Sequence, residues 1–281
     1  MPMEPADSSN ACFPLPAEGQ AWRLVLFKVN ISHRLSNVTL SHEAGGLIHL
    51  VGPNGAGKSS LLACIAGLLP AQGKLILSGK PIHHWHPRAL GVYRGYLGQQ
   101  AYPGGNLAVF QYLMLHQPDP ADNSQALAQT VAYLAQALAL DDKLHRRLAS
   151  LSGGEWQRVR LAAVMLQVWP TINGQAGMLL LDEPAASLDI AQRVALDRLL
   201  AELTAAGMAV LVSSHDLNHS LRHADTVWLM DSGQLVCAGP AAEVMTPERL
   251  GPVFKVAFER LTAGEHSWLH ACSQNLPIMT E

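Results

Sequence analysis

Residues 47–68 read LIHLVGPNGAGKSSLLACIAGL: a short apolar run, a glycine-rich loop and a second apolar run at helical spacing. The loop at 52–59 matches the pattern G-x-x-x-x-G-K-S in the strand–loop–helix setting in which this pattern binds phosphate. Its three glycines can take left-handed turns that point backbone N–H groups inward, and the helix that follows adds the positive end of its dipole. The segment predicts a nucleotide phosphate site, either of an NTPase or of a nucleotide kinase.

The polar residues of this loop have separate predicted roles. Lys58 can reach the β- and γ-phosphates as a point charge, and the Ser59 hydroxyl is placed to ligate Mg²⁺. The alternative is a glycine-rich turn that only joins a strand to a helix, which the flanking strand and helix in register disfavour. The predicted ATP-binding residues are Gly52, Pro53, Asn54, Gly55, Ala56, Gly57, Lys58, Ser59 and Ser60.

A second run, MLLLDE at 178–183, is continuously apolar and ends in two acids. Such a run is typical of a central parallel strand, and functional groups gather at the carboxyl ends of these strands. We expect Asp182 to orient Mg²⁺ through water and Glu183 to position and deprotonate the attacking water. Paired acids that are merely solvated are the alternative interpretation.

The alternation of strands and helices predicts an α/β fold with a largely parallel sheet. Helix-like Leu, Ala and Gln dominate residues 106–149, which predicts a helical subdomain inserted into that core. Asp231, Ser232 and Gly233 are expected to form a hairpin turn. The predicted strands are 22–29, 47–51, 74–77, 178–181, 208–212, 226–230 and 234–238, and the predicted helices are 58–68, 152–168, 190–206 and 217–223.

Composition narrows the function classes. The net charge of −3 leaves no basic stripe for a nucleic acid, so no nucleic-acid partner is expected. No run approaches the ~20 apolar residues of a membrane helix, so a role in transport would need a pore from another chain. The four cysteines lie far apart, which disfavours a disulfide framework or a zinc site. Residues 1–20 lack the features of a secretory signal and are predicted to be a disordered leader.

Residues 151–158, LSGGEWQR, distinguish between the NTPase classes. Ser152 and Glu155 form a capping-box pattern at a predicted helix start, which makes a second helix end suited to an anion. An LSGGE segment between the phosphate loop and the acid-ended strand closely resembles the ATPase family of ABC transporters. The resemblance implies that Ser152, Gly153, Gly154 and Glu155 contact nucleotide.

Further motifs match the same family. Gln99 resembles the glutamine that contacts Mg²⁺ and the attacking water. The segment Ser187, Leu188 and Asp189 resembles the family's D-loop, and His215 in SSHDL resembles its switch histidine. The resemblance implies Glu183, His215 and Gln99 as catalytic residues, Asp189 as a nucleotide contact, and Ser59, Gln99 and Asp182 around Mg²⁺. It also implies the fold of a P-loop ABC ATPase domain at 21–250, with an antiparallel β subdomain, a helical subdomain inserted at about 100–168, and a C-terminal extension at 251–281.

The resemblance implies an assembly as well. Two such domains form a homodimer head to tail, and each ATP lies between the phosphate loop of one subunit and the Ser152 helix end of the other. In the family the surface around Gln99 and the helical insert receives a permease. We therefore expect two copies of a transmembrane permease subunit, a periplasmic substrate-binding protein, and a peripheral position on the cytoplasmic face of the bacterial inner membrane.

One feature departs from the family pattern, because no aromatic residue that could stack on adenine lies between Phe27 and Lys58. Arg34 or His33 could stack there instead. Within the family, residues 24–250 most resemble the ATPase subunits of bacterial cobalamin (vitamin B12) importers. The resemblance is carried by segments such as GEWQRVRLAAV and SSHDLNHSLRHAD. Iron-siderophore and haem importers are the competing interpretation.

Two histidine groups could in principle bind a metal. His83, His84 and His86 are adjacent on a predicted loop without a carboxylate or thiolate nearby. A second group, at i, i+4 spacing, comprises His215, His219 and His223, but we interpret Asn218, His219 and Arg222 as a solvated outer face. A non-transport ABC ATPase would predict paired cassettes or a basic surface, and a small-molecule kinase gives no reason for LSGGE.

Overall fold

The computed structural model describes residues 23–43, 45–99, 106–118, 124–264 and 266–272. The predicted leader at 1–20 lies outside these residues, as do the last residues of the predicted C-terminal extension.

A six-stranded sheet forms the centre, with the strand order β10-β9-β3-β8-β7-β6. All neighbouring pairs are parallel except β9 and β10, which are antiparallel. The predicted hairpin turn between β9 and β10 is confirmed, since Ser232 and Gly233 have φ of 47° and 78°, as a two-residue hairpin turn requires. The strands are β3 (Gly46–Val51), β6 (Arg94–Leu97), β7 (Met178–Asp182), β8 (Ala209–Ser214), β9 (Thr226–Asp231) and β10 (Gln234–Pro240).

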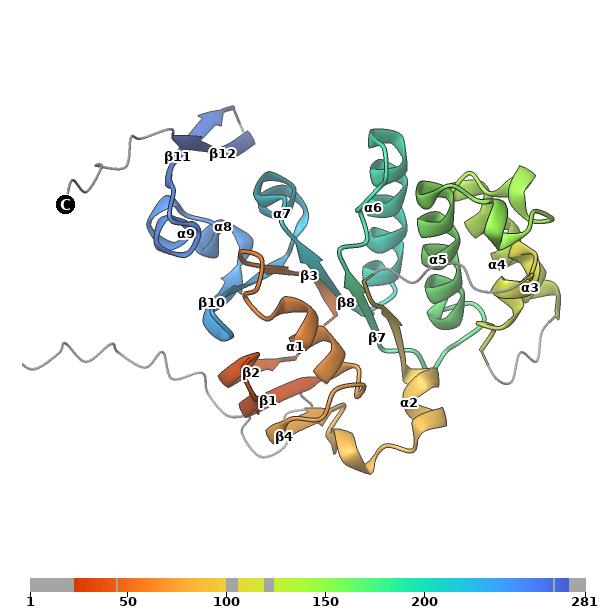
Figure 1. Cartoon of the computed structure of the whole chain (residues 1–281), viewed down its shortest axis with the longest axis horizontal. Coiled ribbons are helices and arrows are strands. Elements are labelled where there is room, and N and C mark those ends of the chain that lie inside the picture. The colour runs from red at the N-terminus through yellow and green to blue at the C-terminus, as the bar shows by residue number, and fades with distance from the viewer. Residues whose placement is uncertain (1–22, 44, 100–105, 119–123, 265, 273–281) are drawn as a thin grey trace, which may run out of the picture.

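The central strands are largely apolar because their residues face cores on both sides, although β3 contains His49 and β8 ends in Ser213 and Ser214. In β7, Leu179 and Leu181 belong to one cluster, whereas Met178 and Leu180 belong to the other. The first cluster includes residues of α5 (Gly153–Val168) and α6 (Ile190–Ala205), and the second includes residues of α1 (Lys58–Ile65) and of the antiparallel sheet (Figure 1). Each fully buried leucine contributes roughly 1.5–3 kcal/mol, so these two cores fix the sheet that carries the motifs.

The antiparallel β subdomain is a four-stranded sheet in the order β2-β1-β4-β5. The strands expected at 22–29 and 74–77 are present here, but β2 was not predicted. Its residues alternate only imperfectly, with Ser36 and Asn37 both exposed, because β2 is an edge strand of the sheet. The bounds are β1 (Leu24–Ile31), β2 (Leu35–His42), β4 (Gln72–Leu77) and β5 (Lys80–Pro81).

The stretch at 106–149 is helical where the structure describes it, as predicted. It comprises α3 (Val109–Met114), α4 (Ser124–Ala137) and two short 3-10 turns, which pack against α5 in one core. The unpredicted helix α2 (Pro87–Tyr93) leads into β6. Of the helices in the described part of the chain, none combines the length and the apolar character needed to cross a membrane.

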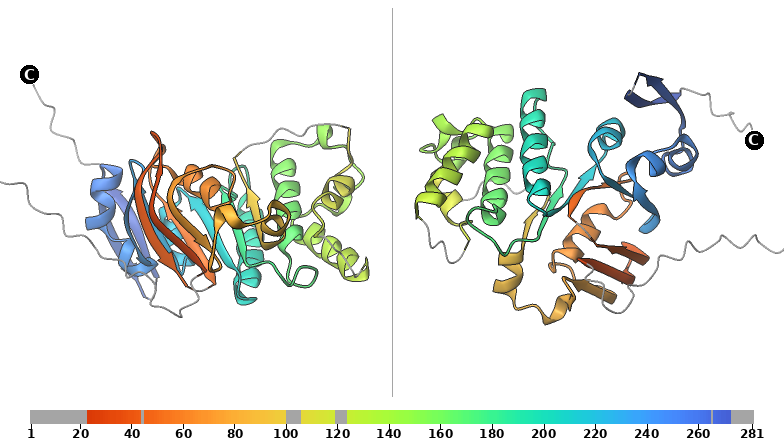
Figure 2. Two further views of the ribbon diagram at one scale, coloured as in Figure 1. Left: turned by 90° about the horizontal axis from the view of Figure 1, so that it is seen from below. Right: turned by 180° about the vertical axis from the view of Figure 1, so that it is seen from behind.

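The C-terminal residues contain more structure than their weak sequence pattern predicted. Helix α7 (Leu217–His223) was predicted with these bounds, whereas α8 (Ala241–Val244), α9 (Pro247–Phe254) and a hairpin of β11 (Ala257–Ala263) and β12 (His266–Cys272) were not. The hairpin and the helices α3 to α5 lie at opposite ends of the molecule (Figure 2). The Asn218 amide on α7 donates to the Leu269 carbonyl at 3.1 Å and accepts from the Leu269 N–H at 2.7 Å, so it fastens β12 to α7.

Replacing Asn218 with alanine should loosen this hairpin, because both hydrogen bonds to Leu269 are lost. At about 0.5–1.5 kcal/mol each, the free energy of local opening should fall by roughly 1–3 kcal/mol. Hydrogen exchange of the 266–272 amides measures this loss directly. Ser267→Ala is the matched control on the same strand, and unchanged exchange at Leu269 in Asn218→Ala would contradict the clamp.

Candidate nucleotide-binding and hydrolysis site

The sheet order brings the predicted motifs together at one edge. Strands β3, β8, β7 and β6 are neighbours and run parallel, so their carboxyl ends lie side by side. The phosphate loop follows β3, His215 follows β8, Glu183 follows β7, and Gln99 lies two residues beyond β6. Four segments that are distant in sequence therefore meet at one end of the sheet.

A cavity of about 680 Å³ opens at this edge. All three predicted catalytic side chains line it, as do both residues proposed to stack on adenine. Its lining consists of His33, Arg34, Asn54, Gly55, Ala56, Gly57, Lys58, Ser59, Ser60, Gln99, Glu183 and His215.

Two glycines of the phosphate loop are required for different reasons. Gly57 is the N-cap of α1 with φ of 97°, a left-handed conformation that L side chains rarely adopt. At Gly52 the requirement is space, since a Cβ would lie 2.3 Å from the Met230 carbonyl oxygen. The predicted left-handed turns thus hold at Gly57 and at Gly55, with φ of 82°, whereas Gly52 is fixed by its close approach to β9.

Lys58 lies at the base of the cavity and is only 6% exposed. Its Nζ donates to the carbonyls of Gly52 at 2.7 Å and Pro53 at 2.9 Å, so the ammonium is held inside the loop. Burial lowers the pKa of Lys58, and the carboxylates of Glu183 and Asp182 act in the opposite direction. The two acids of β7 are therefore electrostatically coupled to the phosphate-loop lysine.

Ser213 joins the two acids and was not predicted as a site residue. Its hydroxyl donates to Asp182 Oδ1 at 2.6 Å and accepts from the Glu183 N–H at 2.8 Å. Asp182 is buried, whereas Glu183 is half-buried and has φ of 50°. A left-handed glutamate is a strained backbone conformation of the kind that clusters at functional sites. Ser213 pairs with Asp182 across β7 and β8, so strand order is the signal that would reveal it.

The LSGGE segment forms the tip of α5 as predicted. The Ser152 Oγ accepts from the Glu155 N–H at 3.3 Å, and Glu155 Oε2 accepts from the Ser152 N–H at 2.8 Å, which completes the capping box. Hydrogen bonds from Ser152 lower the pKa of Glu155, which also lies 3.7 Å from Lys143 Nζ. Ser152 and Gly153 are exposed, and the described lining of the cavity does not include them.

Asp189 is likewise outside the described lining of the cavity. It is the N-cap of α6, where its Oδ1 accepts from the Gln192 N–H at 2.9 Å. The D-loop lies against the tip of α5, because a Cβ on Gly154 would lie 3.0 Å from the Ser187 carbonyl oxygen. Within one chain, the predicted nucleotide contacts therefore divide into the cavity and a separate exposed surface at the α5 tip and D-loop.

Gln157 and Arg160 connect α5 to two loops of the cavity. The Gln157 amide donates to the Pro184 carbonyl at 3.0 Å, and Arg160 donates to Gln157 Oε1 at 3.0 Å and to the Gly98 carbonyl at 2.6 Å. Both side chains are buried. They are positioning residues for Glu183 and Gln99, and nothing in the sequence distinguished them from the other polar residues of α5.

Arg160→Met should slow ATP hydrolysis about tenfold while ATP affinity changes by less than about twofold, because small misplacements at a reacting centre are costly. The Gly98 carbonyl next to Gln99 loses its donor, but the phosphate loop is untouched. Steady-state hydrolysis and nucleotide titration measure the two effects separately.

Arg158→Met is the matched control for this prediction. Arg158 lies on the same helix and is equally buried, but it donates to the Leu138 and Ala139 carbonyls in the helical region. We expect that variant to lose stability without the drop in turnover. Equal turnover in the two variants would show that Arg160 serves stability alone.

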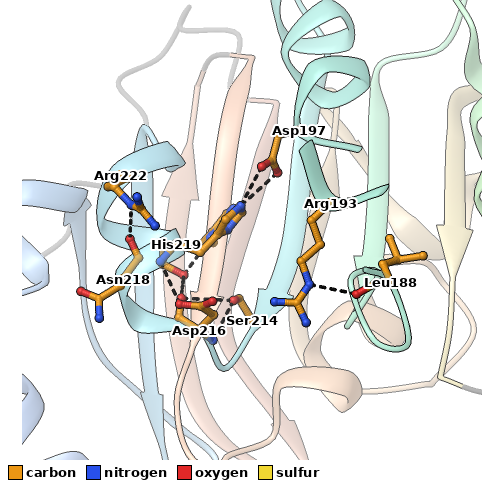
Figure 3. Close-up of polar contacts among 10 residues, drawn as sticks. Leu188, Arg193, Asp197, Ser214, Asp216, Asn218, His219 and Arg222 are labelled. Atoms are coloured by element: carbon orange, nitrogen blue, oxygen red, sulfur yellow. Dashed lines mark hydrogen bonds and ion pairs between the residues drawn. The ribbon is translucent and has the colours of Figure 1, made fainter. Parts of the chain in front are cut away.

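The interpretation of Asn218, His219 and Arg222 as a solvated outer face holds for Arg222, which is exposed, but was wrong for the other two. Asn218 bonds β12, and His219 turns inward, where its Nε2 lies 3.0 Å from both carboxylate oxygens of Asp197 on α6 (Figure 3). Among the described residues, His219 and His223 have ligand atoms grouped with Asp197, and His215 does not belong to that group. The helical period alone could not show this, since α6 supplies the partner.

Comparison with known proteins agrees with this geometry. The ABC transporter family matches residues 35–186. A solved structure of the ATP-binding subunit of an ABC transporter has the same fold, with a TM-score of 0.70 at 22% identity over 82% of this chain and 94% of that one. The chain belongs to the ABC transporter family and is one of its ATP-binding, ATP-hydrolysing proteins.

Its relatives within the family are specific. The vitamin B12 import ATP-binding protein BtuD of Pectobacterium atrosepticum is 51% identical, over 87% of this chain and 97% of the relative. The protein of the same name in Yersinia pseudotuberculosis is 50% identical, over 88% of this chain and 97% of its own length.

Proposed function

We propose that this chain is the ATP-hydrolysing subunit of a vitamin B12 importer. The observation that carries the proposal is 51% identity to a vitamin B12 import ATP-binding protein along 97% of that relative's length. That match covers 87% of this chain. Cargo contacts are not expected on this chain, so the assignment of the cargo follows from kinship.

The cavity supports a specific division of labour in hydrolysis. Lys58 and the loop N–H groups bind the phosphates, and Glu183 positions and deprotonates the attacking water. His215 faces the γ-phosphate, and Gln99 orients the water. His33 or Arg34, at the exposed rim of the cavity, is the candidate for stacking on adenine.

The residues present fit a magnesium ion, which prefers oxygen ligands and retains several waters. The Ser59 hydroxyl and the Gln99 amide line the cavity, and the Asp182 carboxylate lies at the end of β7 near Lys58. These three residues would hold Mg²⁺, Asp182 through water. When bound, the ion neutralises charge on the β- and γ-phosphates.

The two separate nucleotide-facing surfaces support a head-to-tail homodimer. The Ser152–Glu155 helix end is exposed, bears N–H groups suited to an anion, and lies away from the cavity of its own chain. A second copy would supply that helix end to the γ-phosphate, while Asp189 lies beside the same contact. ATP then holds the dimer together and hydrolysis releases it.

The transport role places this chain beneath a membrane. We propose that the dimer binds two copies of a transmembrane permease subunit, with a periplasmic substrate-binding protein in the full complex. Its position would be peripheral, on the cytoplasmic face of the bacterial inner membrane. The surface around Gln99 and the helical region is the candidate permease contact, and Arg160 of α5 bonds the Gly98 carbonyl next to Gln99 there.

An uptake experiment tests this function. Cells of Pectobacterium atrosepticum that lack their own vitamin B12 import ATP-binding protein should regain uptake of labelled vitamin B12 when they express this chain. The matched control, Glu183→Gln, should assemble but not restore uptake. Uptake of an iron-siderophore complex or haem, measured in parallel, should not respond.

Two outcomes would overturn the cargo assignment. One is a chain that hydrolyses ATP in vitro and assembles with the permease, yet leaves vitamin B12 uptake absent. The other is restored uptake of an iron-siderophore complex or haem in place of vitamin B12, which would favour the related importers.

A further inference from the structure

Helices α6 and α7 bring a carboxylate and two imidazoles together outside the nucleotide cavity. The residues are Asp197, His219 and His223, and one ligand atom of each lies within 4.8 Å of the others. None of them has a role in the hydrolysis described above. They lie beside a second cavity of about 390 Å³, which Asp197 and His219 line together with Glu183 and His215.

We propose that Asp197, His219 and His223 bind a zinc ion. Two imidazole nitrogens and one carboxylate oxygen form a ligand set that Zn²⁺ favours over Mg²⁺ or Ca²⁺, which prefer oxygen alone. Water would complete the four-coordinate shell.

The distances are close to those of a tetrahedral site. Bonds of about 2.0–2.1 Å at tetrahedral angles separate ligand atoms by about 3.4 Å. The distances from His219 Nε2 to Asp197 Oδ1 and Oδ2 are 3.0 Å each. The ligand atom of His223 lies within 4.8 Å of the other two, so it has to move by at most about 1.4 Å to reach this spacing.

His219 is already held in place. The backbone N–H of His219 donates to the Asp216 carboxylate, which caps α7. The His219 ring stacks on the His49 ring, with a centroid distance of 5.6 Å and an interplanar angle of 18°. His49 is itself fixed by Ser220, since its Nδ1 lies 2.8 Å from the Ser220 hydroxyl oxygen. Such support orients a ligand before the metal arrives. The proton that Nε2 shares with Asp197 has to leave that nitrogen when the ion binds.

His223 gives the site its entrance. It follows His219 by one helical turn, with ring centroids 4.5 Å apart and rings 24° from parallel. It is exposed, whereas the side chains of His219 and Asp197 are 26% and 22% exposed. An ion can therefore reach the two inner ligands from solvent past His223.

The simpler interpretation of the cluster is an ordinary hydrogen-bonded pair of His219 and Asp197. The role of His223 distinguishes this interpretation from a zinc site. The pair needs only the 3.0 Å contacts between α6 and α7. It makes no use of an exposed imidazole one turn further along. Under the proposal, losing His223 should weaken zinc binding at least about tenfold. Under the simpler interpretation, no tight zinc site exists and the loss of His223 changes nothing.

The experiment titrates the full-length, nucleotide-free chain, without a polyhistidine tag, with Zn²⁺ against a chromophoric chelator and with Co²⁺ by visible absorption. We expect one tight site per chain. His223→Ala and Asp197→Asn should each weaken it at least about tenfold, because even partners behind a ligand cost 10–100-fold. His84→Ala, in the exposed His83–His84 pair, is the matched control and should bind as the wild type does.

Three results would overturn the proposal: no tight site in the wild type, unchanged affinity in His223→Ala, or an equal loss in His84→Ala. Thermal unfolding of each variant guards against a folding artefact. If Asp197→Asn proves unstable, His223→Ala alone decides the outcome, because its exposed side chain can be removed without disturbing the His219–Asp197 pair.

Discussion

Glu183→Gln should bind ATP as tightly as the wild type and hydrolyse it at least about a hundredfold more slowly, since general-base catalysis contributes roughly 10²–10⁴-fold. The amide preserves the shape of the side chain but cannot accept the proton of the attacking water. The lysine and loop N–H groups that bind phosphate remain in place, and so does the bond from the Glu183 N–H to Ser213. Nucleotide titration and steady-state hydrolysis measure the two effects.

Glu243→Gln is the matched control for this change. Glu243 is an exposed glutamate on α8, outside the described lining of the nucleotide cavity. It should hydrolyse ATP at the wild-type rate. Normal turnover in Glu183→Gln would remove Glu183 from its assigned role, and a parallel loss of ATP affinity would make it a binding residue.

Lys58→Ala should weaken ATP binding about a hundredfold. Hydrogen bonds to a charged group contribute about 1.5–3 kcal/mol, and two phosphate contacts at the lower value amount to roughly 3 kcal/mol, or about two factors of ten. The ammonium lies in the cavity, already oriented by the Gly52 and Pro53 carbonyls. A fluorescent ATP analogue measures the affinity.

Lys74→Ala, which removes an exposed lysine of β4, is the corresponding control and should bind ATP normally. Because Lys58 is buried within the loop, thermal unfolding of Lys58→Ala should accompany the titration. A folded variant with wild-type affinity would show that phosphate is bound elsewhere.

The parts of the fold that could be predicted are those with a local cause. Strands β7 and β8 begin with continuous apolar runs, and that of β3 is interrupted only by His49, because both their faces are buried. The phosphate loop and the Ser152 capping box are each recognised from a motif of a few residues. Motif order then placed Gln99, Glu183 and His215 in one site, and the cavity contains all three.

Contacts between distant segments could not be predicted in this way. Ser213 reaches Asp182 only because β7 and β8 pair in that register, and Gln157 reaches Pro184 only because α5 packs beside β7. The inward turn of His219 depends on Asp197, which a helical wheel of α7 does not contain. Each of these contacts is fixed by strand order and helix packing rather than by spacing along the chain.

Strands β2 and β11 were missed for a different reason, which lies in their pattern of apolar and polar residues. Strand β2 lies at the edge of its sheet and exposes polar residues, and β11 is exposed along most of its length. Strand β2 buries Leu35, Val38 and Leu40, but Ser36 and Asn37 are both exposed and break the alternation, whereas no residue of β11 is buried. The position of β2 is fixed by its pairing with β1. The hairpin is fixed by the pairing of β11 with β12 and by the hydrogen bond from Asn218 to β12.

The central claim is that ATP is bound between the phosphate loop of one copy and the α5 tip of another, and light scattering of Glu183→Gln tests it most directly. With saturating Mg-ATP the measured mass should double, and adding Gly153→Arg should keep it at that of one chain. Within the chain a Cβ at Gly153 meets open space, so this change should fold normally and act only at the dimer contact. A mass that stays at one chain with ATP bound, or a dimer that forms equally with arginine at that tip, would contradict the account.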